Sequence, residues 1–246
     1  MLLELNRGVE PGDLLDLSRI AGWRSAERDG DALRLGAGVT YTQVLEDLAG
    51  PLPALALASR TVASRQVRNR ATIAGALVLG DPSGDALAAL GAAGAEVELA
   101  GPRGTRRVAA DAFITAPGAC VLEADELVTA LHVPVADGPV AYAKAGARNA
   151  MARAVCGVAV ALHEAQRTAS VCVVGAAPTA VRPAAAEALV ADAWDALDDE
   201  VVRRFGALVA QAVDPIPDAR GSAAYRRHAA AVLARRALRR AWEDRA

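Results

Sequence analysis

Glycines, a proline and two aspartates gather in one stretch of a chain that is otherwise rich in alanine and leucine. Residues 72–85 read TIAGALVLGDPSGD. Because glycine has no Cβ atom, the backbone amides at Gly75, Gly80 and Gly84 can come close to a ligand. Clustered amides of this kind bind anions such as phosphate, whereas many glycine-rich stretches are ordinary turns. From these residues alone, a phosphate-binding loop and a simple turn both stay open.

One basic residue differs in type from nearly all the others. Lys144 is the only lysine of the chain, and the other side chains counted as basic are arginines. An ammonium group is compact, whereas a guanidinium group is a wide planar fork, so a confined space beside a ring accepts only the former. The sequence therefore singles out Lys144 as a candidate for a confined site, with an accidental surface lysine as the alternative.

Length and composition limit the possible classes of protein. With 246 residues, the chain has room for two domains of ordinary size. The net charge of -2 and the lack of long runs of like charge argue against a nucleic-acid partner. No apolar run is long enough for a signal peptide or a membrane span, so we expect no membrane partner and a cytoplasmic location. Three widely spaced cysteines suit a reducing compartment and form no pair for zinc or iron–sulfur ligation.

The residue pattern predicts two different arrangements of elements. In the first half we expect short strands over 14–20 and 32–39, a helix over 41–49 opened by a capping box of Thr40 and Gln43, helices over 52–63 and 84–91, a hairpin over 95–110, and a strand over 126–135. Turn residues at 135–139 predict a domain boundary. Beyond it, the pattern favours three strands near 140–148, 154–163 and 169–177, with helices from 183 onward.

The segment ASRQVRNRATIAGALVLGDPSGDALAAL resembles the flavin-binding loop of the FAD subunit in the molybdenum hydroxylases, the family of xanthine dehydrogenase and carbon monoxide dehydrogenase medium subunits. Further matches follow in the same order, among them LRLGAGVTY, DELVTALHVP and DARGSAAYRRHAAAVLARRAL. The resemblance covers nearly the whole chain. It implies an α+β fold, with an FAD-binding PCMH-type α/β domain over residues 1–136 and a C-terminal domain of a three-stranded antiparallel sheet plus helices over 139–246.

The same resemblance implies roles for individual residues. Asp85 matches a carboxylate that binds the cofactor, with capping of the following helix as the alternative. Lys144 matches a lysine beside the isoalloxazine ring, where its charge would stabilise the anionic reduced flavin and raise its potential. Val62 and Val128 match apolar contacts to FAD, or serve as core. The backbone that would contact the FAD pyrophosphate is that of Thr72, Ile73, Ala74, Gly75 and Ala76.

This chain also departs from the family pattern. Family members carry a segment close to Ala-Gly-Gly-Thr-Asp before the point that matches Met1, so we expect an N-terminally truncated domain with exposed apolar surface and an unpaired edge strand. Ala74 replaces a glycine and Ala76 replaces an asparagine. An alanine at a position that requires positive φ would be strained, and loss of the asparagine removes a polar contact.

These features favour one function over two others. The resemblance implies an FAD-binding electron-transfer subunit, which receives electrons from 2Fe-2S clusters on a small subunit after oxidation of substrate at a molybdenum–pterin centre on a large subunit. The alternative is a flavin-free scaffold or assembly subunit descended from this family, which the missing glycine segment favours. A self-sufficient flavin oxidase fits less well, because the C-terminal sequence follows the medium-subunit pattern. No general acid, base or nucleophile for a substrate stands out.

Overall fold

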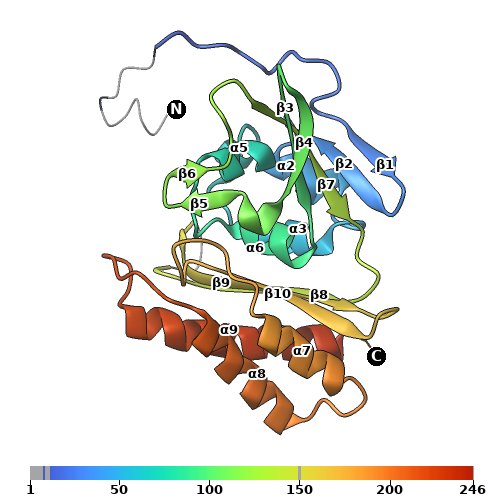
Figure 1. Cartoon of the computed structure of the whole chain (residues 1–246), viewed down its shortest axis with the longest axis vertical. Coiled ribbons are helices and arrows are strands. Elements are labelled where there is room, and N and C mark those ends of the chain that lie inside the picture. The colour runs from blue at the N-terminus through green and yellow to red at the C-terminus, as the bar shows by residue number, and fades with distance from the viewer. Residues whose placement is uncertain (1–7, 9–11, 149–150, 246) are drawn as a thin grey trace.

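A five-stranded antiparallel sheet organises the first half of the molecule. The computed structural model describes residues 8, 12–148 and 151–245 (Figure 1). The strand order is β1-β2-β7-β3-β4, and every neighbouring pair is antiparallel. The strands are Ala26–Asp29 (β1), Ala32–Gly36 (β2), Glu96–Gly101 (β3), Gly104–Ala109 (β4) and Leu127–Pro134 (β7). Between β4 and β7 lie a short 3-10 helix, Ala110–Ala112, and a small sheet of Ile114–Ala116 (β5) and Ala119–Cys120 (β6).

Within the described residues, five short helices accompany this sheet, and three of them begin with a side-chain cap. They are Tyr41–Asp47 (α2), Pro53–Arg60 (α3), Arg65–Arg68 (α4), Ile73–Val78 (α5) and Asp85–Ala92 (α6). The predicted capping box is confirmed: the Thr40 side chain accepts from the Gln43 amide, and the Gln43 side chain accepts from the Thr40 amide. Pro53 stands in the first turn of α3, where its missing N–H costs no helical hydrogen bond.

The second half has three strands followed by helices, as predicted. The sheet order is β10-β9-β8, from Val140–Gly146 (β8), Ala154–His163 (β9) and Thr168–Val174 (β10). Three helices follow: Ala184–Asp192 (α7), Asp199–Ala212 (α8) and Ala223–Glu243 (α9). Figure 1 shows this sheet as a middle layer, with α7–α9 on one face and α3 and α6 on the other.

Burial of β9 and α6 explains their apolar sequences. Residues 154–162 of β9 are all buried, because α9 covers one face of the strand and α6 the other. All eight residues of α6 are buried between the two sheets. A helix with no solvent-facing side cannot be amphipathic, so its sequence DALAALGA is small and apolar throughout, apart from Asp85 at its start. The start of α6 is therefore a rigid place from which to present a carboxylate.

Two expectations about the first half are wrong. Residues 14–20 form turns and irregular chain, and the hairpin partner of β2 is β1. The sequence of β1, AERD, is polar and exposed on both faces, so it lacks the alternation that marks a half-buried strand. The glycine-rich stretch is also not an open loop, since residues 73–78 form α5. Among the described residues, no helix combines the length and the apolar character that a membrane crossing needs.

Candidate functional site

A buried polar cluster joins the two halves of the molecule at the start of α6. Tyr142 and Lys144 are two residues apart on β8, so their side chains point to the same face of the sheet. Both meet Asp85: the Tyr142 hydroxyl donates to Oδ1, and Lys144 Nζ donates to Oδ2 at 2.9 Å. The Asp85 and Lys144 side chains are only 7% and 12% exposed. The two side chains thus form an ion pair, almost shielded from solvent, between α6 and β8.

The ammonium group of Lys144 has three hydrogen-bond acceptors. Besides Asp85, it donates to the carbonyl oxygen of Ala152 at 2.9 Å and to that of Thr61 at 3.2 Å. A lysine has three N–H donors, so the protein itself satisfies all of them. In this arrangement Lys144 would act on a bound molecule through its positive charge. A hydrogen bond from Lys144 Nζ to that molecule would have to replace one of the three that it makes within the chain. The alternative of an accidental surface lysine is wrong.

Asp85 does not cap the helix that follows it. Gly84 is the N-cap residue and Asp85 is the first helical residue, with its carboxylate turned toward β8. Burial, together with the negative charge of Asp85, raises the pKa of the Tyr142 hydroxyl well above its usual value. Burial and the charges of Asp85 and Asp81 likewise raise the pKa of Tyr41. Both phenols thus stay protonated, and Tyr142 remains a donor to the carboxylate over the physiological range.

Helix α5 begins with a side-chain cap. The Thr72 hydroxyl accepts from the Gly75 amide at 3.0 Å, the Ile73 amide donates to Val39 O, and the Ala76 amide donates to Thr72 O. Within the described residues, the Ala74 amide is left without an acceptor, as is usual for the second position of a helix. Ala74 and Ala76 are helical and have negative φ, so the strain considered for these alanines does not arise.

The three glycines have three separate structural tasks. Gly75 lies on the exposed side of α5 and donates its amide to Thr72. Gly80 has φ of +66° and packs against Gly118 and Ala119 so closely that a Cβ atom would lie 2.8 Å from their backbone. Gly84 caps α6 and donates to Asp81 O at 3.0 Å. Their amides are all engaged within the chain, so they do not form one shared cradle for an anion.

The two valines occupy different environments. Val62 is half-buried in the turn after α3, next to Thr61, whose carbonyl oxygen accepts from Lys144. Val128 is 7% exposed on β7 and belongs to the core of the first half. Helix α5 packs against both β7 and α6. The structure therefore brings the turn of Val62 together with Asp85 and Lys144, places α5 beside them, and makes Val128 chiefly a core residue.

Sequence reasoning missed three members of this cluster. Tyr142, Thr61 and Ala152 all contact the Asp85–Lys144 pair. Tyr142 had a usable signal, since it stands two residues from Lys144 on a predicted strand and so shares its face. Thr61 and Ala152 contribute only backbone oxygens, which no side-chain pattern can reveal. Ala63, just after Val62, has φ of +41°, an uncommon conformation for a residue other than glycine.

Comparisons with known proteins identify a family for both halves of the chain. The family described as "FAD binding domain in molybdopterin dehydrogenase" matches residues 1–136, and the "CO dehydrogenase flavoprotein C-terminal domain" matches residues 141–241. The carbon monoxide dehydrogenase medium chain of Hydrogenophaga pseudoflava is 31% identical over 96% of this chain and 84% of its own length. That of Afipia carboxidovorans is 32% identical over 96% of this chain and 83% of its own length.

The fold comparison leads to the same relatives. The solved structure of carbon monoxide dehydrogenase from Hydrogenophaga pseudoflava, in a form that lacks the Mo-pyranopterin moiety of the molybdenum cofactor, contains a chain with a TM-score of 0.91 and 31% identity. The match covers 100% of this chain and 88% of that one. One family thus spans more than half of the chain, and the relatives match it nearly from end to end. We conclude that this chain belongs to the FAD-binding medium subunits of the molybdenum hydroxylases, which are subunits of oxidoreductases.

Proposed function

We propose that this chain holds FAD where α5, the start of α6 and β8 meet, and passes electrons through it. The electrons would come from 2Fe-2S clusters on a small partner subunit, after oxidation of substrate at a molybdenum–pterin centre on a large partner subunit. They would leave to an external acceptor. FAD supplies the capacity to take up and release electrons, which side chains of this composition lack. The chain supplies binding, orientation and charge.

The observation that carries this proposal is the buried pair of Asp85 and Lys144. A buried ion pair contributes little to stability compared with apolar residues of the same volume, because both charges lose their hydration. Here the pair is almost dry, with a 2.9 Å contact, and lies at the junction of the two halves. Buried charges of this kind gather at functional sites. A lysine held there by three acceptors presents a fixed positive charge to a neighbouring flavin.

The remaining matched residues fit a dinucleotide. The Ala74 amide and the bare backbone of Gly75 would face the pyrophosphate, with Ile73, Thr72 and Ala76 holding the shape of α5. Each oxygen of the Asp85 carboxylate has a second lone pair, so it can still accept from a nucleotide hydroxyl or amino group. Val62 would give an apolar contact from its half-buried turn. Val128 would support that surface from within the core.

The proposal is tested by adding FAD to the purified full chain and following the quenching of flavin fluorescence. Wild type should take up one FAD per chain, and Lys144→Met should bind it more weakly. Arg240→Gln is a matched control, because Arg240 carries the same charge on the exposed face of α9, where it pairs with Asp244. Uptake by wild type and Lys144→Met with equal affinity would remove Lys144 from the site.

A second candidate, a flavin-free assembly subunit, is favoured by one specific observation. The donors of Lys144 and the amides of Gly75, Gly80 and Gly84 are all satisfied within the chain, so the cluster is complete without a ligand. On this reading the Asp85–Lys144 pair only fixes the two halves against each other. A wild-type chain that stays colourless and takes up no FAD in the titration would support this candidate over the first.

A further inference from the structure

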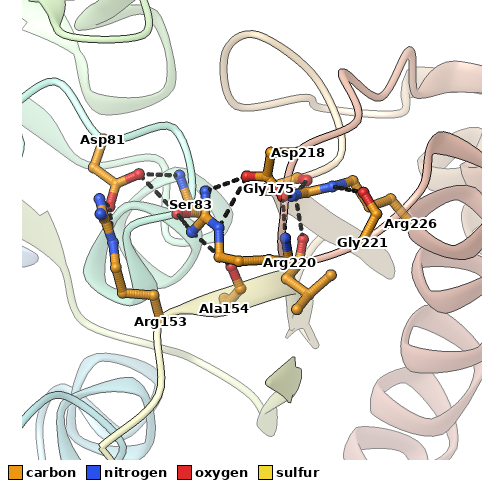
Figure 2. A network of polar contacts seen from close by, with 10 residues as sticks. Asp81, Ser83, Arg153, Ala154, Gly175, Asp218, Arg220, Gly221 and Arg226 are labelled. Carbon is orange, nitrogen blue, oxygen red and sulfur yellow. Dashed lines mark hydrogen bonds and ion pairs between the residues drawn. The ribbon is translucent and has the colours of Figure 1, made fainter. Parts of the chain in front are cut away.

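A chain of polar contacts leads from the start of α9 to the turn that precedes Asp85. Figure 2 shows it crossing between the two halves of the molecule, from Arg226 through Asp218 and Arg220 to Ser83 and Asp81. The 81–85 turn, DPSGD, leads directly into α6, whose first residue is Asp85. None of the arginines in this network belongs to the residues that the proposed function places beside FAD.

Arg226 is the buried end of the network. Its residue is only 3% exposed, which is rare for an arginine. Its guanidinium donates to Val155 O at 2.7 Å and to Gly175 O, and it pairs with the Asp218 carboxylate. Val155 lies on β9 and Gly175 directly follows β10, so one planar group ties both strands to α9. A planar fork with several donors is suited to such a task.

Two series of contacts, here called routes, connect Arg226 and Asp218 with the 81–85 turn. On the first, the Gly175 amide donates to Pro82 O at 2.8 Å, while Gly175 itself has φ of +74° and no room for a Cβ atom beside Val155 O. On the second, Arg220 donates to Asp218 at 2.9 Å through Nε, and its terminal nitrogen reaches Ser83 Oγ at 3.3 Å. Both routes start from the same Asp218–Arg226 pair.

Asp81, the first residue of the turn, is also held by hydrogen bonds and an ion pair. Asp81 accepts from the Ser83 hydroxyl at 2.7 Å and from the Ser83 amide at 3.1 Å, and it pairs with Arg153 just before β9. Burial alone would raise the pKa of Asp81, but the hydrogen bonds from Arg153 and Ser83 outweigh it and lower the pKa. The turn is thus tied to the second half of the molecule at Asp81, Pro82 and Ser83, which leaves Asp85 little freedom.

We propose that Arg220 and Arg226 are positioning residues for the 81–85 turn, Arg220 through Ser83 and Arg226 through Gly175 and Asp218. By holding this turn they would fix the Asp85 carboxylate against Lys144. This inference rests on the proposed function, because the positioned group belongs to the flavin site. Neither arginine touches that site. The C-terminal helix α9 would therefore govern how well the first half holds FAD, through contacts at the turn rather than through the ligand.

The test uses Arg220→Gln in the full chain, because Arg220 is partly exposed and its loss leaves the buried Arg226 paired with Asp218. Hydrogen exchange of the Gly84 and Gly175 amides is measured together with FAD affinity. We expect faster exchange at these amides, and FAD affinity weaker by about threefold to tenfold, which corresponds to the loss of about one ordinary hydrogen bond. Arg220→Lys should recover part of both effects. Arg240→Gln, on the exposed face of α9, should change neither.

A second variant tests the route. If Arg220 acts through Ser83, the double variant Ser83→Ala with Arg220→Gln should lose little more FAD affinity than the stronger single variant. Additive losses would overturn the proposed route. Unchanged exchange and affinity in Arg220→Gln would overturn the positioning role, and so would faster exchange spread over α8 and α9, which marks a general loss of stability. If wild type takes up no FAD, the proposed function fails, while the exchange at Gly84 and Gly175 still decides whether Arg220 holds the turn.

Discussion

At the scale of single residues, the pairing of Lys144 with Asp85 governs the site. Either charge alone in this nearly dry position would be costly, because each has lost most of its water. Tyr142 adds a hydrogen bond to the same carboxylate from the same strand face. Removal of Lys144 would leave Asp85 with a single neutral donor. The two charges are therefore one energetic unit, and their substitutions should not be additive.

The first prediction follows from this coupling. Lys144→Met should lower the free energy of unfolding by about 3–5 kcal/mol, the usual cost of a buried charge without its partner. Adding Asp85→Asn should restore a large part of that loss, because no buried charge then remains. Urea unfolding of wild type, both single variants and the double variant measures the coupling. Additive losses in the double variant would show that the two side chains do not depend on each other.

At the scale of elements, capping and cross-strand contacts position the site. Thr72 starts α5, Gly84 starts α6, and Glu98 links three strands of the larger sheet. The Glu98 carboxylate accepts from Arg34 on β2 at 2.7 Å and from Thr129 on β7 at 2.6 Å, and it lies 2.8 Å from His132 Nε2 on β7. These contacts fix the sheet against which α5 packs.

The second prediction concerns the start of α5. Thr72→Ala should lower the free energy of unfolding by about 0.5–2 kcal/mol, because the Gly75 amide loses its acceptor. Thr72→Ser is the matched control, since serine offers the same hydroxyl and should keep most of the stability. Chemical denaturation of the three proteins measures the difference. A serine variant as unstable as the alanine variant would mean that the methyl group, and not the cap, matters.

The third prediction is a pH dependence of the sheet. Burial alone would raise the pKa of Glu98, but hydrogen bonds from Arg34, Thr129 and His132 lower it from 4.5 to about 2. A lowered pKa in the folded state means that the stabilisation is present above pH 4.5 and is lost as the pH falls toward 2. In Glu98→Gln, the free energy of unfolding should therefore fall less over this window than in wild type. Glu96→Gln, an exposed position on the same strand, is the control, and it should keep the wild-type acid dependence.

Much of this element structure follows from sequence, and the failures have physical causes. The capping box at Thr40 and the apolar strands β7 and β9 carry strong local signals, so they are predicted. Strand β1 is not, because an exposed edge strand is held by backbone pairing with β2 and needs no apolar pattern. Helix α5 is not predicted, because its cap is a threonine three residues before a glycine, without the Glu or Gln partner of a capping box.

At the scale of the whole molecule, α6 is shared by both halves. It packs between the larger sheet's core and the β8–β9–β10 sheet, and it carries Asp85 at its start. Near its C-terminal end, α6 lies very close to β10. A Cβ atom on Gly91 would be 2.5 Å from Cys172 Sγ. The sequence predicted the cluster members Asp85 and Lys144 singly. Their contact depends on this packing of distant segments, which residue patterns do not encode.

The fourth prediction tests that packing. Gly91→Ala should destabilise the chain by about 1–3 kcal/mol, because the added methyl group has no space beside Cys172. Combining it with Cys172→Ala removes the sulfur atom and should recover part of the loss. Thermal or chemical unfolding of the single and double variants measures how much stability the removal of the sulfur atom restores. A Gly91→Ala protein as stable as wild type would show that the two halves can separate slightly at no cost.

The proposed electron-transfer role depends on a flavin whose potential responds to the charge of Lys144. The decisive measurement is the midpoint potential of bound FAD in wild type, in Lys144→Met and in Lys144→Met with Asp85→Asn, each saturated with FAD. The potential should be highest in wild type, intermediate in the neutral double variant and lowest in Lys144→Met, which loses the ammonium group and keeps the Asp85 carboxyl group. The fall in Lys144→Met should be about 30 mV or more, which corresponds to about 1.4 kcal/mol for a two-electron couple. Equal potentials in the three proteins would contradict a role of Lys144 beside the flavin.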